Sequence, residues 1–179
     1  RSEVVQYDNA TIGSGTAKDG VKYMYDDWGM LATYAEDRDS AVTGGGNQYT
    51  TSYTWAKATP GRNTLRVTSY TLPSGRAIDL QFRTTGGLLD GAASRVTMVA
   101  DGATVLARYW YNGLGQVVGQ EHGEPDVMWR MYGSTGVYPD LDVFNRVVSS
   151  RWTKDFVSSP PDFDFYSVAL TYDRNSNFT

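Results

Sequence analysis

The residues of this chain that could do chemistry begin with a single histidine. His122 lies between two glutamates in the segment Glu121-His122-Gly123-Glu124. An imidazole beside carboxylates can act as a general base or bind a metal. A zinc site needs further nitrogen or sulfur ligands, and the sequence holds no second histidine and no cysteine. We therefore interpret His122 as a residue of a solvated acidic loop over residues 121–126.

Two closely spaced carboxylate pairs are the next candidates. Asp140 with Asp142, and Asp162 with Asp164, are each two residues apart, a spacing that shares one face of a strand. Such pairs could hydrolyse glycosides or bind calcium. Neither pair belongs to a complete calcium loop, so we expect solvated turn or surface carboxylates. The chain also has no Gly-x-Ser-x-Gly elbow and no phosphate-binding loop. We expect no catalysis, no metal and no cofactor.

Aromatic residues could form a platform on which sugars stack. Tyr49, Tyr53 and Trp55 alternate along one face of an expected strand, and Trp110 and Trp129 belong to a second aromatic group. Aromatic rings on strands more often pack between neighbouring hairpins. Carbohydrate binding or adhesion through these five residues is therefore the alternative function, with glycans as its partners.

Composition limits the classes of protein that fit. The 179 residues carry a net charge of −4, which argues against nucleic acid as a partner because binding to phosphates requires a basic patch. The sequence contains no run of about 18 apolar residues, so we expect no membrane span. Aromatic residues make up 13% of the chain, and Thr and Val are abundant. This composition favours strands.

A short phrase recurs five times and predicts the architecture. Each copy has an aromatic or apolar residue, a polar turn that ends in Gly, Asn or Ser, and usually an apolar pair, which is the pattern of a strand, a tight turn and the next strand. The copies lie at residues 25–31, 70–78, 111–118, 141–148 and 172–177. The residues that define them are Tyr25, Asp26, Gly29, Tyr70, Gly75, Tyr111, Asn112, Gly115, Asp142, Asn145, Tyr172, Asp173 and Asn177.

Each part of the phrase has a physical role. Tyr at the strand end is expected to pack its ring on the neighbouring hairpin and keep its hydroxyl in water. The following Asp or Asn can bond to the turn backbone, and Gly accepts a left-handed conformation. A single hairpin cannot bury its own face, so neighbouring hairpins must stack. We expect an all-β fold, an open or spiralling antiparallel array of hairpins that neighbouring chains could complete.

The expected elements follow the chain as one segment over residues 1–179, with an edge strand and loop at 1–20 and repeats at 21–179. Asp101-Gly102 lies between two alternating runs and predicts a type I′ turn. Residues 86–94 are the least strand-like region. The other expected strands are 21–25, 30–34, 49–58, 65–72, 76–82, 95–100, 103–111, 116–120, 127–132, 147–152 and 163–171.

The phrase resembles the YD repeats of Rhs (rearrangement hot spot) proteins. The resemblance covers residue 21 to the end and is carried by Arg108-Tyr109-Trp110-Tyr111-Asn112-Gly113-Leu114-Gly115-Gln116-Val117-Val118 and by Thr171-Tyr172-Asp173-Arg174-Asn175-Ser176-Asn177. It implies long β-sheets that wrap into a hollow shell, as in polymorphic toxins, insecticidal toxin complexes and teneurins. This chain is too short to close such a shell, and it lacks the Asp-Pro-x-Gly motif of the family's self-cleaving core.

We therefore expect a structural or assembly segment of a secreted or cell-surface Rhs-like protein. It would form part of a β-shell or a subunit of an extracellular filament. The expected partners are other copies of the chain, or flanking repeats of the same precursor, joined by strand pairing. The chain starts with Arg1 and shows no signal-peptide pattern, so we expect a piece of a longer precursor.

Overall fold

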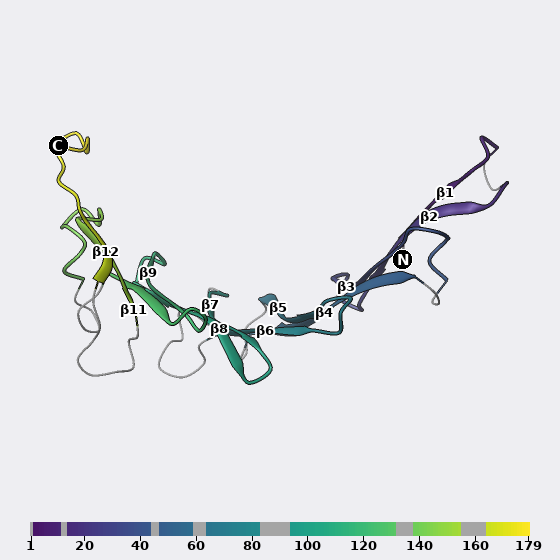
Figure 1. Ribbon diagram of the computed structural model, residues 1–179, viewed down its shortest axis with the longest axis horizontal. Coiled ribbons are helices and arrows are strands. Elements are labelled where there is room, and N and C mark those ends of the chain that lie inside the picture. The colour runs from purple at the N-terminus through teal and green to yellow at the C-terminus, as the bar shows by residue number, and fades with distance from the viewer. Residues whose placement is uncertain are drawn as a thin grey trace. The chain divides into compact units, whose positions relative to one another are not determined.

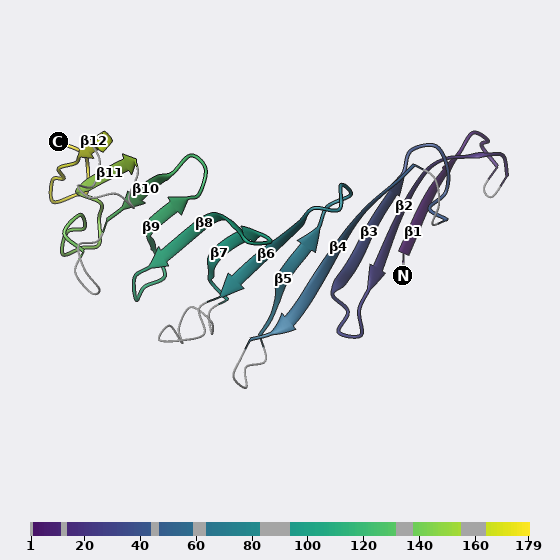
Figure 2. The same cartoon turned by 60° about the horizontal axis from the view of Figure 1, so that its bottom comes forward.

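The protein is described by a computed structural model that covers residues 2–11, 14–43, 47–58, 64–82, 94–131, 138–154 and 164–179. Within these ranges the regular structure is β throughout (Figure 1). Twelve strands form one sheet whose order follows the sequence from β1 to β12. Successive strands lie side by side as antiparallel neighbours (Figure 2). The predicted all-β array of antiparallel hairpins is confirmed.

The strands have the following bounds: β1 (Ser2–Tyr7), β2 (Ala17–Tyr25), β3 (Leu31–Asp37), β4 (Gln48–Lys57), β5 (Leu65–Thr71), β6 (Ala77–Phe82), β7 (Val96–Asp101), β8 (Thr104–Tyr111), β9 (Val117–His122), β10 (Val127–Arg130), β11 (Ser149–Lys154) and β12 (Asp164–Ala169). The chain divides into two compact units, Arg1–Leu80 and Gln81–Thr179, with the boundary inside β6. Each unit is described by itself, and the expectation of a single repeat segment over 1–179 stays a prediction.

In the first unit a connecting loop packs against β2. The N–H groups of Asp39 and Ser40 donate to Oδ1 of the buried Asp37 at 3.0 and 2.9 Å and turn the chain back over the sheet. These bonds, led by that from Asp39, hold the pKa of Asp37 below its ordinary value. Gly20 provides the space, because a Cβ there would lie 2.8 Å from the amide nitrogen of Val42. Val42 is buried in this contact.

In the second unit the two faces of the sheet differ in chemistry. On one face Arg108 and Glu121 are cross-strand partners and form an ion pair of 2.6 Å. On the other face a cross-strand row runs over four strands. It consists of Gln120, Trp129, Trp152 and Tyr166.

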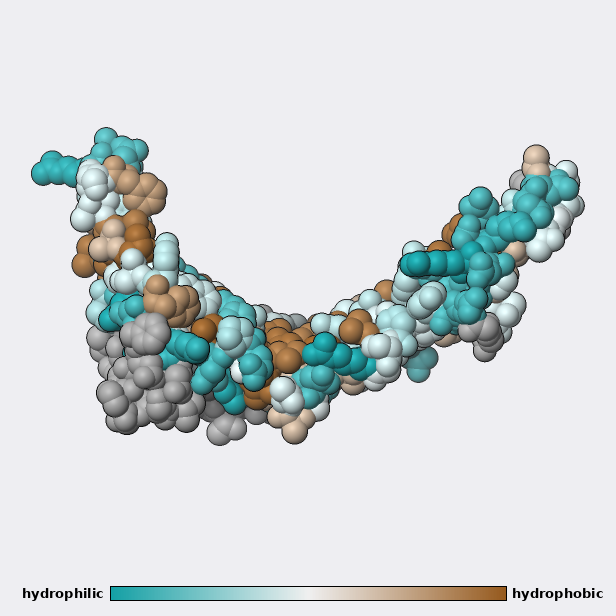
Figure 3. Space-filling view, in the orientation of Figure 1, coloured by the Kyte–Doolittle hydropathy of each residue, from teal (hydrophilic) through white to brown (hydrophobic). Residues whose placement is uncertain are grey.

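The core is thin, as expected for a single layer of strands. The buried apolar side chains in the described ranges are mostly small and are distributed along the chain. They are Ala35, Val42, Ala58, Ile78, Ala100, Ala107, Val118, Met128 and Met131. In the space-filling view hydrophobic patches alternate with hydrophilic ones over the face shown (Figure 3). Strand pairing and contacts between neighbouring hairpins therefore stabilise the fold, rather than one large core.

Several expected boundaries change. Strand β2 begins at Ala17, so the segment 1–20 holds the start of a second strand as well as the edge strand. The Asp101-Gly102 turn is not type I′, because Asp101 pairs with Thr104 and only Gly102 has positive φ, 57°. Its two-residue loop starts with Gly, as in a type II′ turn. Strand β10 ends at Arg130, β11 is Ser149–Lys154 and β12 is Asp164–Ala169.

Some predicted features lie outside the described residues, namely residues 86–93 of the least strand-like region and Asp162 of the second carboxylate pair. In the described part of the chain, no helix is long and apolar enough to cross a membrane.

Candidate functional site

The five repeat turns share one backbone geometry. In each, the first residue donates its N–H to the carbonyl four residues later, and the fourth donates back to the carbonyl of the first. The fourth residue has positive φ, which closes a type I turn with a following bulge. The first residues are Asp26, Leu72, Asn112, Asp142 and Asp173. The fourth residues and their φ values are Gly29 (77°), Gly75 (82°), Gly115 (86°), Asn145 (63°) and Ser176 (66°).

In four of these turns the side chain of the first residue caps the loop. Its Oδ1 accepts the N–H groups of the third and fifth residues at 2.8–3.0 Å. This is why Asp or Asn recurs after the aromatic residue. The looser copy has Leu72 at this place, and there Ser74 Oγ accepts the N–H of Arg76 at 3.4 Å.

The capping bonds also shift the titration of two carboxylates. Burial acts to raise the pKa of Asp142, but bonds from the N–H and side chain of Arg146 and from the N–H of Phe144 outweigh it and hold the pKa below its ordinary value. Bonds from the side chain and N–H of Asn177 lower the pKa of Asp173. Both groups are therefore held as anions and serve as turn caps.

The apolar pair after the turn has a structural reason. Val117 is the cross-strand partner of Tyr111, while Gly119 is the partner of Trp110, so Val118 is the extra residue of a β-bulge. A bulge brings two consecutive side chains toward the same side of the sheet. Val118 is buried to 1% exposure, so both the pair and its apolar character follow from this local geometry.

Three turns of the second unit lie on the same side of the sheet, at the ends of its strands, and each is bonded to the next. The first two share an amide cluster, in which Asn145 Nδ2 donates to Gln116 Oε1 at 2.7 Å and Asn112 Nδ2 donates to the same atom at 3.2 Å. Asn112 Nδ2 also lies 3.4 Å from Asn145 Oδ1. The side chains thus fix how one turn sits against the next.

An arginine clamp joins the second of these turns to the third. Arg146 Nε forms a 2.6 Å ion pair with Asp142 Oδ2 in its own turn, and its Nη1 donates to Ser176 Oγ at 3.1 Å in the next turn. The guanidinium lies 4.5 Å from the ring centroid of Tyr172, whose hydroxyl donates to the carbonyl of Val147 at 2.8 Å.

The same arrangement occurs earlier in this unit. The guanidinium of Arg95 lies 5.7 Å from the ring centroid of Tyr111, and the Tyr111 hydroxyl donates to the carbonyl of Val96 at 2.7 Å. A Cβ at Gly115, the position that corresponds to Ser176, would lie 2.7 Å from Arg95 Nη2. The expectation that the repeat tyrosines keep their hydroxyls in water is wrong for Tyr111 and Tyr172, because a backbone carbonyl of the protein accepts each one.

The first unit uses a related contact but a different turn arrangement. Trp55 Nε1 donates to the carbonyl of Leu31, the residue directly after the turn at 26–30, at 2.8 Å. The turn at 26–30 joins β2 to β3, and the turn at 72–76 joins β5 to β6. Because the strands are antiparallel and follow sequence order, the two turns lie at opposite ends of the strands. Tyr25 is 48% exposed. Tyr70 and Tyr53 are cross-strand partners.

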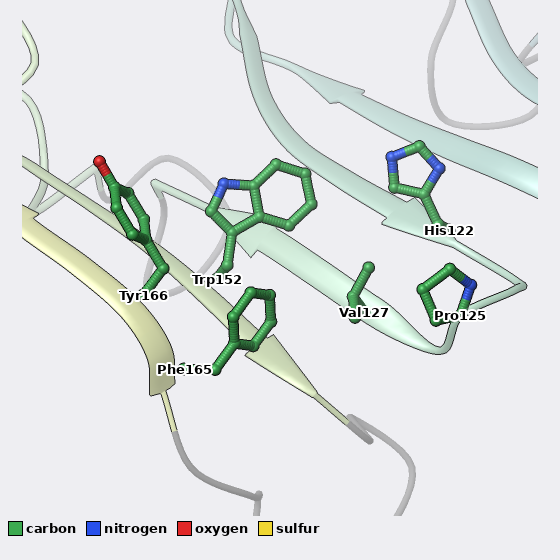
Figure 4. Close-up of a pocket in the computed structure, with 6 residues that line it drawn as sticks. All are labelled: His122, Pro125, Val127, Trp152, Phe165 and Tyr166. Atoms are coloured by element: carbon green, nitrogen blue, oxygen red, sulfur yellow. The ribbon is translucent and has the colours of Figure 1, made fainter.

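The second unit has an open pocket of about 590 Å³ (Figure 4). It is lined by His122, Pro125, Val127, Trp152, Phe165 and Tyr166. His122 stacks on Trp152 with ring centroids 6.0 Å apart and an angle of 17° between the rings. Trp152 also contacts Trp129, at 6.4 Å between centroids.

A bulge explains why two consecutive residues of β12 line this pocket. Trp152 is the partner of Tyr166, and Thr153 is the partner of Asp164, so Phe165 is the extra residue of the strand. Without the bulge, Phe165 and Tyr166 would lie on opposite faces. No sequence pattern marks such a bulge, so the sequence alone does not identify Trp152, Phe165 and Tyr166 as site residues.

The interpretation of His122 as a solvated loop residue is wrong. His122 is the last residue of β9, the cross-strand partner of Val127, and only partly exposed. Its Nε2 lies 2.8 Å from Gln120 Nε2. Within the described ranges no group of three or more His, Asp or Glu side chains could hold a metal ion.

The carboxylate pair at 140 and 142 also differs from expectation. Asp140 is buried, with Oδ2 3.6 Å from Arg151 Nη2, whereas Asp142 caps its turn. A β-bridge pairs Leu141, which lies between them, with Val147 beside the turn. The two carboxylates therefore have separate partners, and Asp140 is not the solvated group that we expected.

The five expected stacking residues are not brought together as one set. Trp129 pairs with Gln120 of β9, and Trp110 pairs with the preceding residue, Gly119. Consecutive residues of a strand point to opposite faces, so the two tryptophans lie on opposite faces of the sheet. Trp129 Nε1 donates to Ser150 Oγ at 2.7 Å and Trp55 Nε1 to Leu31. Tyr49 is 49% exposed and lies beneath Arg38, while Tyr53 is partly buried. Sugar stacking through these residues stays a prediction.

Comparisons with known proteins support the fold. No family model and no curated protein matches the sequence. A chain in the crystal structure of TcdB2-TccC3 is similar, with a TM-score of 0.55 and 14% identity over 98% of this chain. A chain in the crystal structure of TcdB2-TccC3-TEV is similar with a TM-score of 0.53 and 13% identity over 99% of this chain. This chain spans 9% of the length of each.

At these identities the similarity concerns the fold alone. The repeat-like β architecture expected from the resemblance to Rhs proteins therefore has counterparts in solved structures of much longer chains. No family model supports the resemblance at the level of sequence.

Proposed function

We propose that this chain is a structural segment of a Rhs-like YD-repeat protein, either part of a β-shell or a subunit of an extracellular filament. The observation that carries the proposal is the set of bonds between consecutive turns. Arg146 and the Asn112–Gln116–Asn145 cluster join the three turns of the second unit in succession. Such bonds stabilise an array of hairpins, and the side chains that make them are already bonded to other turns of the protein. Similarity to a segment of a much longer chain is consistent with this role.

The proposal includes strand pairing with flanking repeats or with other copies. In the described chain β1 and β12 each have a strand neighbour on one side only. Val4 of β1 is 69% exposed and Tyr166 of β12 is 54% exposed. Open edges of this kind accept a further strand. Secretion or display at the cell surface is part of the same proposal and rests on the resemblance to Rhs proteins.

We further propose that the chain has no catalytic activity of its own. The carboxylates of Asp142 and Asp173 accept backbone N–H groups and are held as anions, which suits a cap and not a proton donor. His122 is stacked on Trp152 and bonded to Gln120, so its imidazole has a packing role.

Hydrogen–deuterium exchange tests the structural role. In dilute solution the amides of β1 and β12 should exchange fast, while those of β9 stay protected by two neighbours. At high concentration, or within the longer parent protein, β1 and β12 should gain protection. Edge strands that are already protected in the dilute monomer, or that never gain protection, would contradict the proposal. Electron microscopy separates its two versions, because filaments of the purified chain support the filament subunit and isolated monomers argue against it.

A further inference from the structure

The aromatic pocket on the second unit takes no part in the network of turns. Phe165 and Tyr166 are 52% and 54% exposed at its wall, although burial of large aromatic side chains is favourable. In the close-up the rings of Trp152, Phe165 and Tyr166 lie beside one another, with His122 and Pro125 across the pocket (Figure 4). Their exposure and convergence point to a ligand that uses ring faces.

The described residues of the lining are aromatic or aliphatic, and none of them is a carboxylate. Nε2 of His122 lies 2.8 Å from the side-chain amide nitrogen of Gln120, so this ring nitrogen already has a hydrogen-bond partner in the protein. The wall therefore offers π-faces and almost no hydrogen-bonding capacity. A sugar needs several polar partners at its hydroxyl groups, whereas a cation can be held by ring faces alone.

The charges at the rim favour a cation. Glu124 and Asp126 lie on either side of Pro125 in the turn between β9 and β10. One basic residue opposes them, because Lys154 is the cross-strand partner of Val127 and shares its face. Counted over the described residues of this turn and Lys154, carboxylates exceed ammonium groups by one. An anion would be repelled by this charge and by the electron-rich faces of the rings.

We propose that this pocket binds a small organic cation through an alkylated ammonium group. A primary ammonium keeps three N–H donors that need acceptors, and the lining residues that the structure describes offer them no carboxylate oxygen. A quaternary ammonium presents methyl groups with spread positive charge, which suits contact with Trp152 and Tyr166. This inference is independent of the structural role proposed above, since the pocket residues make none of the bonds between turns.

Titration of the 179-residue chain with choline, followed by NMR of the tryptophan indole N–H groups, tests the proposal. The matched control ligand is 3,3-dimethylbutan-1-ol, which has the shape of choline without its charge. Choline should bind in a saturable manner and roughly 3- to 30-fold more tightly than the neutral compound. n-Butylammonium should bind more weakly than choline. Equal affinity for the neutral compound, tighter binding of n-butylammonium or no saturable binding of choline would each overturn the proposal.

Protein variants locate the binding. Tyr166→Leu keeps apolar area at an exposed position but removes the π-face, and it should weaken choline binding by at least about threefold. Phe144→Leu is the matched control, because Phe144 is 75% exposed on the same unit and does not line this pocket. Its affinity for choline should equal that of the parent chain. Equal losses in both variants would overturn the assignment to this pocket.

The rim charges give a further test by their opposite signs. Lys154→Gln removes a like charge and should tighten choline binding by about twofold, whereas Glu124→Gln should weaken it by a similar factor, and both effects should decrease at high salt. Changes of the same sign in the two variants would contradict a cationic ligand. Circular dichroism checks that each variant keeps its β structure.

Discussion

The guanidinium of Arg146 lies over the ring of Tyr172, 4.5 Å from its centroid. Arg146 ends one repeat turn, and Tyr172 directly precedes the next, 26 residues further along the sequence. The hydroxyl of Tyr172 donates to the carbonyl of Val147, so ring and hydroxyl both contact the preceding turn region. This pair joins two neighbouring hairpins, and loss of the contact should destabilise the packing of one turn against the next.

The Tyr172 hydroxyl provides the simplest test. Tyr172→Phe keeps the ring beneath Arg146 but leaves the carbonyl of Val147 without this donor. We expect the free energy of unfolding to fall by about 0.5–1.5 kcal/mol, measured by urea denaturation. Tyr25→Phe is the control, because Tyr25 is 48% exposed, and it should change stability by less than about 0.5 kcal/mol. Equal effects of the two substitutions would show that the hydroxyl bond contributes nothing.

The clamp of Arg95 over Tyr111 is tested at the neighbouring glycine. Gly29 and Gly115 both have positive φ, so alanine at either position should cost about 1–2 kcal/mol. A Cβ at Gly115 would also displace the guanidinium of Arg95, whereas a Cβ at Gly29 meets nothing within 4 Å. Gly115→Ala should therefore cost about 0.5–1 kcal/mol more than Gly29→Ala in urea denaturation.

That excess should disappear when Arg95 is first changed to methionine, because the displaced group is then absent. An excess that persists in the Arg95→Met background would assign it to backbone strain at Gly115.

The turns were predictable from the sequence because their chemistry is local. An Asp or Asn that can cap its own loop, followed three residues later by Gly, Asn or Ser, depends only on residues within the turn. Asn145 and Ser176 show that the pattern holds without glycine, since both have positive φ. The all-β class followed from the same signals and from composition.

The pocket and the clamps were not predictable, because they depend on register between strands. Phe165 reaches the pocket through a bulge, and the partner of Trp152 is set by the register between β11 and β12. Arg146 and Tyr172 meet only once β11 and β12 are aligned. His122 was placed in a loop because its acidic neighbours and Gly123 are typical of loops, whereas pairing with Val127 extends β9 through it.

The Asp142 cap should make part of the stability depend on pH. Its pKa in the folded chain lies below the unfolded value of about 3.9. The stabilisation is therefore fully present above the unfolded pKa and is lost as the pH falls through the lower, folded pKa. Asp142→Asn keeps an Oδ1 acceptor, as Asn112 does in its turn, but removes the titrating group and the ion pair with Arg146.

Urea denaturation of both proteins between about pH 2 and pH 7 measures this effect. The variant should be less stable than the parent at neutral pH, and its stability should fall less steeply below about pH 4. If variant and parent lose stability in parallel over this range, titration of Asp142 makes no contribution to folding.

Close approach of two backbones at Gly123 predicts a strongly destabilising substitution. Its N–H donates to the carbonyl of Leu106 at 3.1 Å, and a Cβ on Gly123 would overlap the carbonyl oxygen of Val105. Gly123→Ala should therefore push the end of β9 away from β8 and lower the free energy of unfolding by about 1–3 kcal/mol. Gly113→Ala is the control, because its Cβ would meet nothing within 4 Å and its φ is not positive, so its effect should stay within about 0.5 kcal/mol. Since His122 precedes Gly123, the shift should also change the NMR signal of the Trp152 indole, while Gly113→Ala should leave that signal in place. Similar stability of the two variants would mean that β8 and β9 can separate at this point without cost.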